Sequence, residues 1–140
     1  MLKETRKYVD FDGVEREEDF YFNFTKAELM QMELSVKGGF HSYIEQIVKA
    51  KDETELIRLF KELLEKSYGV KSPDGRKFIK NAQVLEDFTQ TEAYSDLFME
   101  LATDANKASK FVNGIFPAAL QAEVEKERNR QNVLSGPGAK

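Results

Sequence analysis

The chain has 140 residues, of which 33% are charged, a formal net charge of −4 and no cysteine. This length is enough for one domain with a sizeable core. Without cysteine there is no disulfide framework, no thiolate zinc site and no cysteine nucleophile, which fits a reducing cytoplasm. The negative charge argues against nucleic acid as the main partner. No N-terminal run is typical of a signal peptide and no apolar run approaches the ~20 residues that cross a bilayer, so no membrane contact is expected.

Residues 3–24 predict a β-hairpin, because two strand-like runs flank Asp12-Gly13, a strong signal for a tight turn. A two-residue loop would place Phe11 opposite Val14 and would require a positive φ at Gly13. A two-stranded hairpin is not stable alone, so one of its faces must pack on helices. Alternation along the second strand predicts which residues do so: Phe20, Phe22 and Phe24.

The other residues of the second strand predict a partly exposed surface. Tyr21 and Asn23 face away from the phenylalanines, and Tyr21 is a candidate for contact between copies of the chain, with simple solvation as the alternative. An acidic run is interpreted as a strand edge that discourages sheet-to-sheet pairing rather than as a metal site. This run comprises Glu15, Glu17, Glu18 and Asp19.

The strongest helical pattern lies in residues 52–69. Asp52 and Glu55 have capping-box spacing, and Gly69 is placed where a left-handed residue ends a helix. The apolar residues fall on one half of the helix and predict a buried stripe: Leu56, Ile57, Leu59, Phe60, Leu63, Leu64 and Tyr68.

The remaining residues predict a mainly α protein, a small bundle of about six short helices that follows the hairpin. Residues 1–128 are expected to form a single domain, and residues 129–140 a disordered tail, because apolar anchors end at Val124 and a Gly-Pro-Gly run follows. The helices are expected in 26–128, with individual segments near 26–35, 40–50, 81–88, 89–101, 104–113 and from 117 onward.

The helix at 26–35 lacks a single apolar stripe. Leu29, Met30, Met32 and Leu34 spread around it. We favour a helix sandwiched between other elements, and the alternative is that it offers methionines to a partner, since methionine adapts to varied surfaces. Met99 also lies off the stripe of its helix and is a further candidate contact.

A turn at residues 72–75, Ser-Pro-Asp-Gly, predicts a second small hairpin between Val70 and Phe78-Ile79. Cations cluster around this turn. They indicate either a solvated turn or a docking site for an acidic partner. A contact with nucleic-acid phosphates is a third alternative, which the negative net charge of the chain disfavours. These cations are Lys71, Arg76, Lys77 and Lys80.

Chemistry-bearing motifs are sparse. There is no phosphate-binding loop, and His41 is the only histidine, which we interpret as a surface or boundary residue. No convergent catalytic set, cofactor site or metal site is expected, so an enzyme is the least favoured class.

Three stretches together resemble the tail assembly chaperones of long-tailed phages and prophages of Gram-positive bacteria. They are DGVEREEDFYFNFTKAELMQMEL, SYGVKSPDGRKFIKN and FTQTEAYSDLFMELATDANKASKFVNGIFP, and the resemblance runs from about Lys3 to Pro117. It implies a non-enzymatic protein that binds the tape-measure protein, keeps it soluble and extended, and assists polymerisation of the tail tube. It further implies self-association on the client, the tail tube protein as an additional partner, a place in the host cytoplasm and absence from the mature virion.

The resemblance does not indicate which residues bind the client. The candidate partner-binding residues are Met30, Met32, Met99 and Tyr21. Two other functions are kept open: a structural virion protein of the head–tail connector or tail, and a small regulator that binds nucleic acid.

Overall fold

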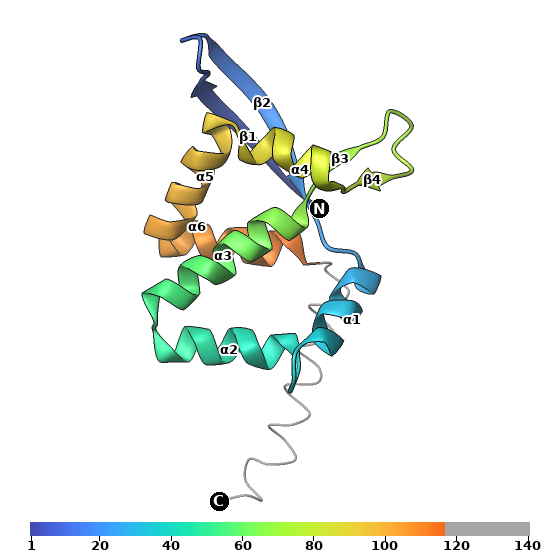
Figure 1. The fold of residues 1–140 in the computed structure, drawn as a ribbon, viewed down its shortest axis with the longest axis vertical. Coiled ribbons are helices and arrows are strands. Elements are labelled where there is room, and N and C mark those ends of the chain that lie inside the picture. Colours follow the sequence, from blue (N-terminus) through green and yellow to red (C-terminus); the bar gives the residue numbers. More distant parts are fainter. Residues whose placement is uncertain (117–140) are drawn as a thin grey trace, which may run out of the picture.

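A computed structural model describes residues 1–116, drawn in colour in Figure 1. The predicted helix from residue 117 and the predicted tail at 129–140 lie outside the described residues. Within 1–116 the fold is mainly α with an N-terminal hairpin, as predicted, and has six helices. The elements are β1 (Leu2–Val9), β2 (Glu15–Phe22), α1 (Lys26–Ser35), α2 (Phe40–Ala50), α3 (Glu53–Ser67), β3 (Tyr68–Lys71), β4 (Phe78–Ile79), α4 (Ala82–Thr89), α5 (Glu92–Thr103) and α6 (Ala105–Ile115).

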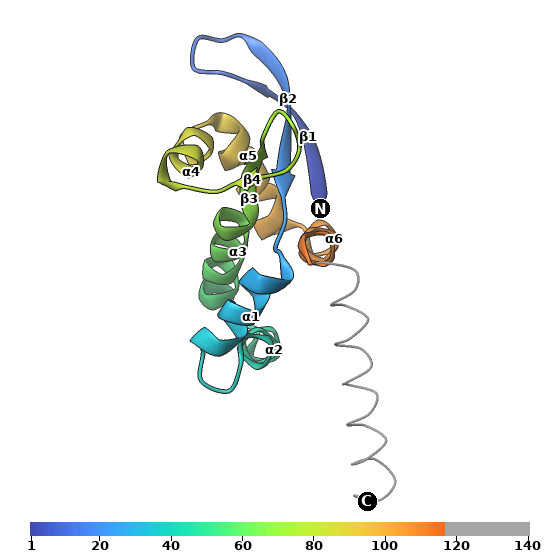
Figure 2. The same ribbon diagram turned by 90° about the vertical axis from the view of Figure 1, so that its right-hand side faces the viewer.

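The two hairpins form one antiparallel sheet of order β1-β2-β3-β4. The second hairpin forms as predicted, with Val70 opposite Ile79. The sequence did not indicate that β2 also pairs with β3, where Tyr21 lies opposite Gly69. This short pairing ties the N-terminal hairpin to the helices, while the rest of β2 extends beyond β3. The hairpin turn therefore projects at one end of the molecule, opposite α2 (Figures 1 and 2).

The predicted two-residue loop of the first hairpin is wrong by one residue. Val9 pairs with Glu15, and the Asp10 N–H donates to the Val14 carbonyl at 2.9 Å, so Asp10 lies opposite Val14 and the loop has three residues, 11–13. The reason lies in Asp10, whose carboxylate accepts hydrogen bonds from the backbone N–H groups of Asp12 and Val14, both at 2.9 Å. Gly13 follows with φ 79°, as predicted, and donates its N–H to the Asp10 carbonyl at 3.0 Å. Such a loop is the common three-residue hairpin connection.

The phenylalanine face of β2 lies at the centre of the core. Phe22 is fully buried, and its ring centroid lies 5.6 Å from that of Tyr68, 5.7 Å from Phe88 and 5.3 Å from Phe111. Edge-on and tilted aromatic contacts of this kind stabilise a core beyond the area that they bury. The hairpin is thus held by helices on one face, as the alternation predicted. The buried residues packed around it include Phe20, Phe24, Leu59, Leu63, Leu64, Leu97, Leu101 and Ile115.

Three helix boundaries differ from the sequence prediction. Gly69 does not have a positive φ and lies in β3, because α3 leads directly into that strand at Tyr68. A Cβ on Gly69 would lie 2.6 Å from the Phe78 ring, so glycine is needed there for close packing. Helix α6 continues to Ile115, past the predicted end near residue 113, and so includes Gly114. The N-cap of α5 is Thr91, two residues after the predicted start near residue 89.

Helix α1 is not sandwiched between other elements. It begins with the predicted capping box, in which the Thr25 hydroxyl accepts from the Glu28 N–H and the Glu28 carboxylate accepts from the Thr25 N–H. Only Leu29 and Met32 of this helix are buried, so most of its surface faces solvent. The apolar residues of α1 therefore fall into two groups: Leu29 and Met32 are buried in the core, and Met30 and Leu34 are exposed.

Candidate protein-binding surfaces

The four predicted contact residues occupy different environments. Met30 on α1 is 61% exposed and Met99 on α5 is 55% exposed. Met32 is only 9% exposed and belongs to the core, so in this conformation it offers little surface to a partner. Tyr21 is half-buried, and the ammonium of Lys71 lies 4.3 Å from its ring centroid. The structure therefore does not gather these four residues into one site.

The apolar surface of α1 contains a residue that the sequence analysis did not select. Leu34 is 78% exposed and follows Met30 by four positions, so both lie on the same side of the helix. We call this pair the α1 outer face. The signal was present in the sequence as an i,i+4 apolar pair off the buried positions. Exposed apolar side chains that adjoin one another are typical of protein interaction sites.

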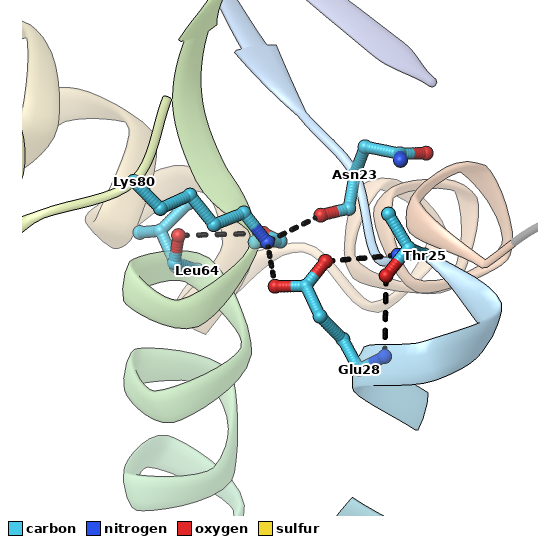
Figure 3. Close-up of polar contacts among 6 residues, drawn as sticks. Asn23, Thr25, Glu28, Leu64 and Lys80 are labelled. Carbon is cyan, nitrogen blue, oxygen red and sulfur yellow. Dashed lines mark hydrogen bonds and ion pairs between the residues drawn. The ribbon is translucent and has the colours of Figure 1, made fainter. Parts of the chain in front are cut away.

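Polar contacts fix the start of α1 to the segments that follow β2 and β4 (Figure 3). The Lys80 ammonium donates to the Asn23 carbonyl and to the Glu28 carboxylate, both at 2.7 Å. Burial of Glu28 favours its neutral form, but the hydrogen bonds from Lys80 and Thr25 outweigh this and hold the pKa of Glu28 below its ordinary value of 4.5. The α1 outer face is therefore presented by a helix with a well-anchored beginning.

A groove of about 610 Å³ lies between α3 and the start of α4. Tyr68, Ala82 and Leu85 supply its apolar surface, and its rim carries four cations and two carboxylates. Its volume falls in the range of ordinary binding sites. The charged lining residues are Arg58, Lys61, Lys66, Lys80, Glu62 and Glu65. A smaller hollow beside it, lined in part by Met32 and Lys66, lies under α1.

The projecting turn of the first hairpin is a further apolar surface. Phe11 at its apex is 77% exposed, and Val9 and Val14 beside it are 51% and 53% exposed. We call residues 9–15 the hairpin tip. Asp10 holds its shape through the two backbone hydrogen bonds and an ion pair with Arg16 at 2.6 Å. The tip thus presents a large aromatic side chain from a defined turn.

The basic cluster around residues 72–75 is largely engaged within the chain. Lys71 covers Tyr21, Lys80 binds Glu28, and Arg76 lies 3.3 Å from Asp74. These contacts leave little free positive charge for tracking a phosphate backbone. In residues 1–116, no group of three or more His, Asp or Glu side chains is arranged to hold a metal ion. None of the helices in that range is long and apolar enough to cross a membrane.

These surfaces belong to a small sheet-and-helix scaffold with exposed apolar patches, a form suited to binding other proteins. The family described as phage tail assembly chaperone matches residues 1–137. The chain belongs to this family, and its general role is therefore in the assembly of phage tails. No curated protein and no solved structure matches the chain.

Proposed function

We propose that this protein binds the tape-measure protein of its phage and keeps it soluble and extended while the tail tube polymerises around it. The membership of the tail assembly chaperone family carries this proposal. A tape-measure protein is a very long helical chain with apolar surface, and such a chain needs covering until the tube encloses it. The proposal places this activity in the host cytoplasm, with the chaperone absent from the mature virion and the tail tube protein as a further partner.

The α1 outer face is the surface that we propose for client contact. Met30 and Leu34 are exposed and adjacent, and the flexible thioether of methionine tolerates partners of varied shape. Met99 on α5 is a secondary candidate because it lies on another helix. A typical specific interface buries about 800 Å² per partner, so one domain covers a short length of a long helix and many copies are needed.

Surface variants test this assignment. Met30→Asp and Leu34→Asp place a charge at the proposed contact and should lower client affinity at least about tenfold, because burying an unpaired charge is unfavourable. Both sites are exposed, so the free energy of unfolding should fall by about 1 kcal/mol or less, including the cost of an acidic residue in the last turn of α1. Gln31→Asp is the control, since Gln31 is exposed on the same helix outside this pair. Equal capture of the client by all three variants would refute the assignment.

A further inference from the structure

The described part of the chain ends beside the start of α1. The Phe24 N–H donates to the Ile115 carbonyl at 2.9 Å, and the ring of Phe116 stacks on that of Phe24 with centroids 6.0 Å apart. Phe24 directly precedes Thr25, the N-cap of α1. The end of α6 and the start of α1 accordingly lie together in both ribbon views (Figures 1 and 2). Residue 117 is therefore joined to a point beside the first turn of α1.

The α1 outer face has no cover among the described residues. Met30 and Leu34 are 61% and 78% exposed, and Leu34 is the most exposed large apolar side chain in residues 1–116. Removing such apolar surface from water is favourable, so the face gains from any apolar group that can reach it. The nearest source of such a group is the part of the same chain that follows α6.

The segment that follows α6 has an apolar pattern that matches this face. Leu120 and Val124 are the only large apolar side chains in residues 117–132, and they are four positions apart, as are Met30 and Leu34. Two i,i+4 pairs present their side chains at the same spacing when both segments are helical. The sequence predicts a helix in this segment, so the two pairs would be in register along parallel helices.

The segment is also long enough to reach the face. Helix α1 has 10 residues, which is about 15 Å at the rise of an α-helix. Residues 117–124 span about 12 Å as a helix and about 26 Å when extended, so they can pass along α1 from its start. A short tether gives an effective concentration in the millimolar range. A contact too weak to hold a separate peptide is therefore populated within one chain.

We propose that residues 117–124 cover the α1 outer face of their own chain, with Leu120 against Met30 and Val124 against Leu34, and that the client displaces them. The displacement rests on the proposed function, since it takes this face as the client contact. The cover hides apolar surface that would otherwise favour unwanted association. It also lowers the apparent affinity for the client, because only chains with the face uncovered can bind.

Methionine oxidation of the full chain reports the cover without any substitution. Hydrogen peroxide transfers one oxygen atom to the thioether sulfur of an accessible methionine, which gives the sulfoxide and water. Met30 and Met99 are exposed to similar extents in the described fold, 61% and 55%. Peptide mass spectrometry should nevertheless show that Met30 oxidises at least about threefold more slowly than Met99, because only a minority of chains leave Met30 uncovered. An intramolecular cover gives the same ratio at every protein concentration.

Two double variants of the full chain test which residues form the cover. Leu120→Asp/Val124→Asp places charges in the proposed contact and should raise the oxidation rate of Met30 at least about threefold, because a buried unpaired charge is unfavourable. It should also lower the Kd for the tape-measure protein at least about threefold, because no cover has to be displaced. Gln121→Asp/Asn129→Asp adds the same charge and keeps both apolar side chains, so it should behave as wild type.

The outcomes separate this inference from the proposed function. Equal oxidation rates of Met30 and Met99 in wild type would overturn the cover, even where the client is captured. Protection of Met30 that grows with protein concentration would also overturn it, because a second copy would then supply the cover. Protection of Met30 with equal client capture by wild type and Leu120→Asp/Val124→Asp would overturn the displacement. Protection of Met30 with no capture by either form would support the cover and contradict the proposed function.

Discussion

Replacing Lys80 with methionine removes the ammonium that joins β4 to the start of α1, while it keeps most of the apolar stem of the side chain. Two hydrogen bonds of 2.7 Å are lost, one to the Asn23 carbonyl and one to the Glu28 carboxylate. Hydrogen bonds that involve charged groups contribute about 1.5–3 kcal/mol when desolvated. The Lys80 and Glu28 side chains are 22% and 33% exposed, so we expect a loss near the lower part of that range, about 2 kcal/mol.

The pH dependence of this loss distinguishes a charge effect from lost packing. The pKa of Glu28 is lower in the folded protein than its ordinary value of 4.5, so its contribution is present in full above that value and disappears as the pH falls through the folded-state pKa. Lys80→Met removes a main cause of this lowering. The difference in unfolding free energy between wild type and Lys80→Met should therefore be largest near pH 7 and shrink below about pH 4.

Urea unfolding at pH 7 and at pH 3 measures the loss of unfolding free energy in Lys80→Met and its dependence on pH. The control is Lys26→Met, an exposed lysine at the first residue of α1, which should change the unfolding free energy by less than about 0.5 kcal/mol. A Lys80→Met loss that is equally small, or one that is the same at both pH values, would refute the role assigned to this ion pair.

Three further substitutions test other parts of the fold by thermal or urea unfolding. Gly13→Val should destabilise by about 1–2 kcal/mol, because φ at this residue is 79°; an unchanged midpoint would mean that the turn is placed wrongly. Gly69→Ala should destabilise by about 1–3 kcal/mol, since its Cβ would lie 2.6 Å from the Phe78 ring, and a neutral result would contradict that packing. Glu100→Gln should destabilise by about 1 kcal/mol at pH 7 and less at pH 3, because the hydrogen bond from Lys107 leads the contacts that lower the pKa of Glu100; pH-independent loss would argue against this.

The sequence predicted the elements whose causes are local. Thr25 and Glu28 form their capping box, Gly13 has its positive φ, and Gly75 donates to the Ser72 carbonyl in the predicted turn. Each of these depends on residues within a few positions of one another. The one-residue error in the hairpin loop is also local, because the longer loop is held by the Asp10 carboxylate, which accepts from the backbone N–H groups of Asp12 and Val14.

The long-range features could not be read from periodicity. The pairing of Tyr21 with Gly69 joins segments that no local pattern relates, and the Lys80 contact with Glu28 spans 52 positions. Gly69 is placed where a helix would be expected to end. Glycine is needed at this position for a different reason, because the Phe78 ring on β4 packs directly against it. Among the candidate contacts, the exposure of Met99 was predictable from its place off the stripe of its helix. The exposure of Met30 was not, because its helix has no single apolar stripe and was expected between other elements. The groove was not predictable either, because its lining comes from several elements.

Binding of the tape-measure protein is best tested by co-expressing it with this protein from the same genome and measuring the mass of the purified complex. We expect a soluble complex in which many copies of the chaperone accompany each tape-measure chain, and an insoluble client when the chaperone is left out. A client that remains insoluble in the presence of this protein, or that is equally soluble without it, would contradict the proposed function.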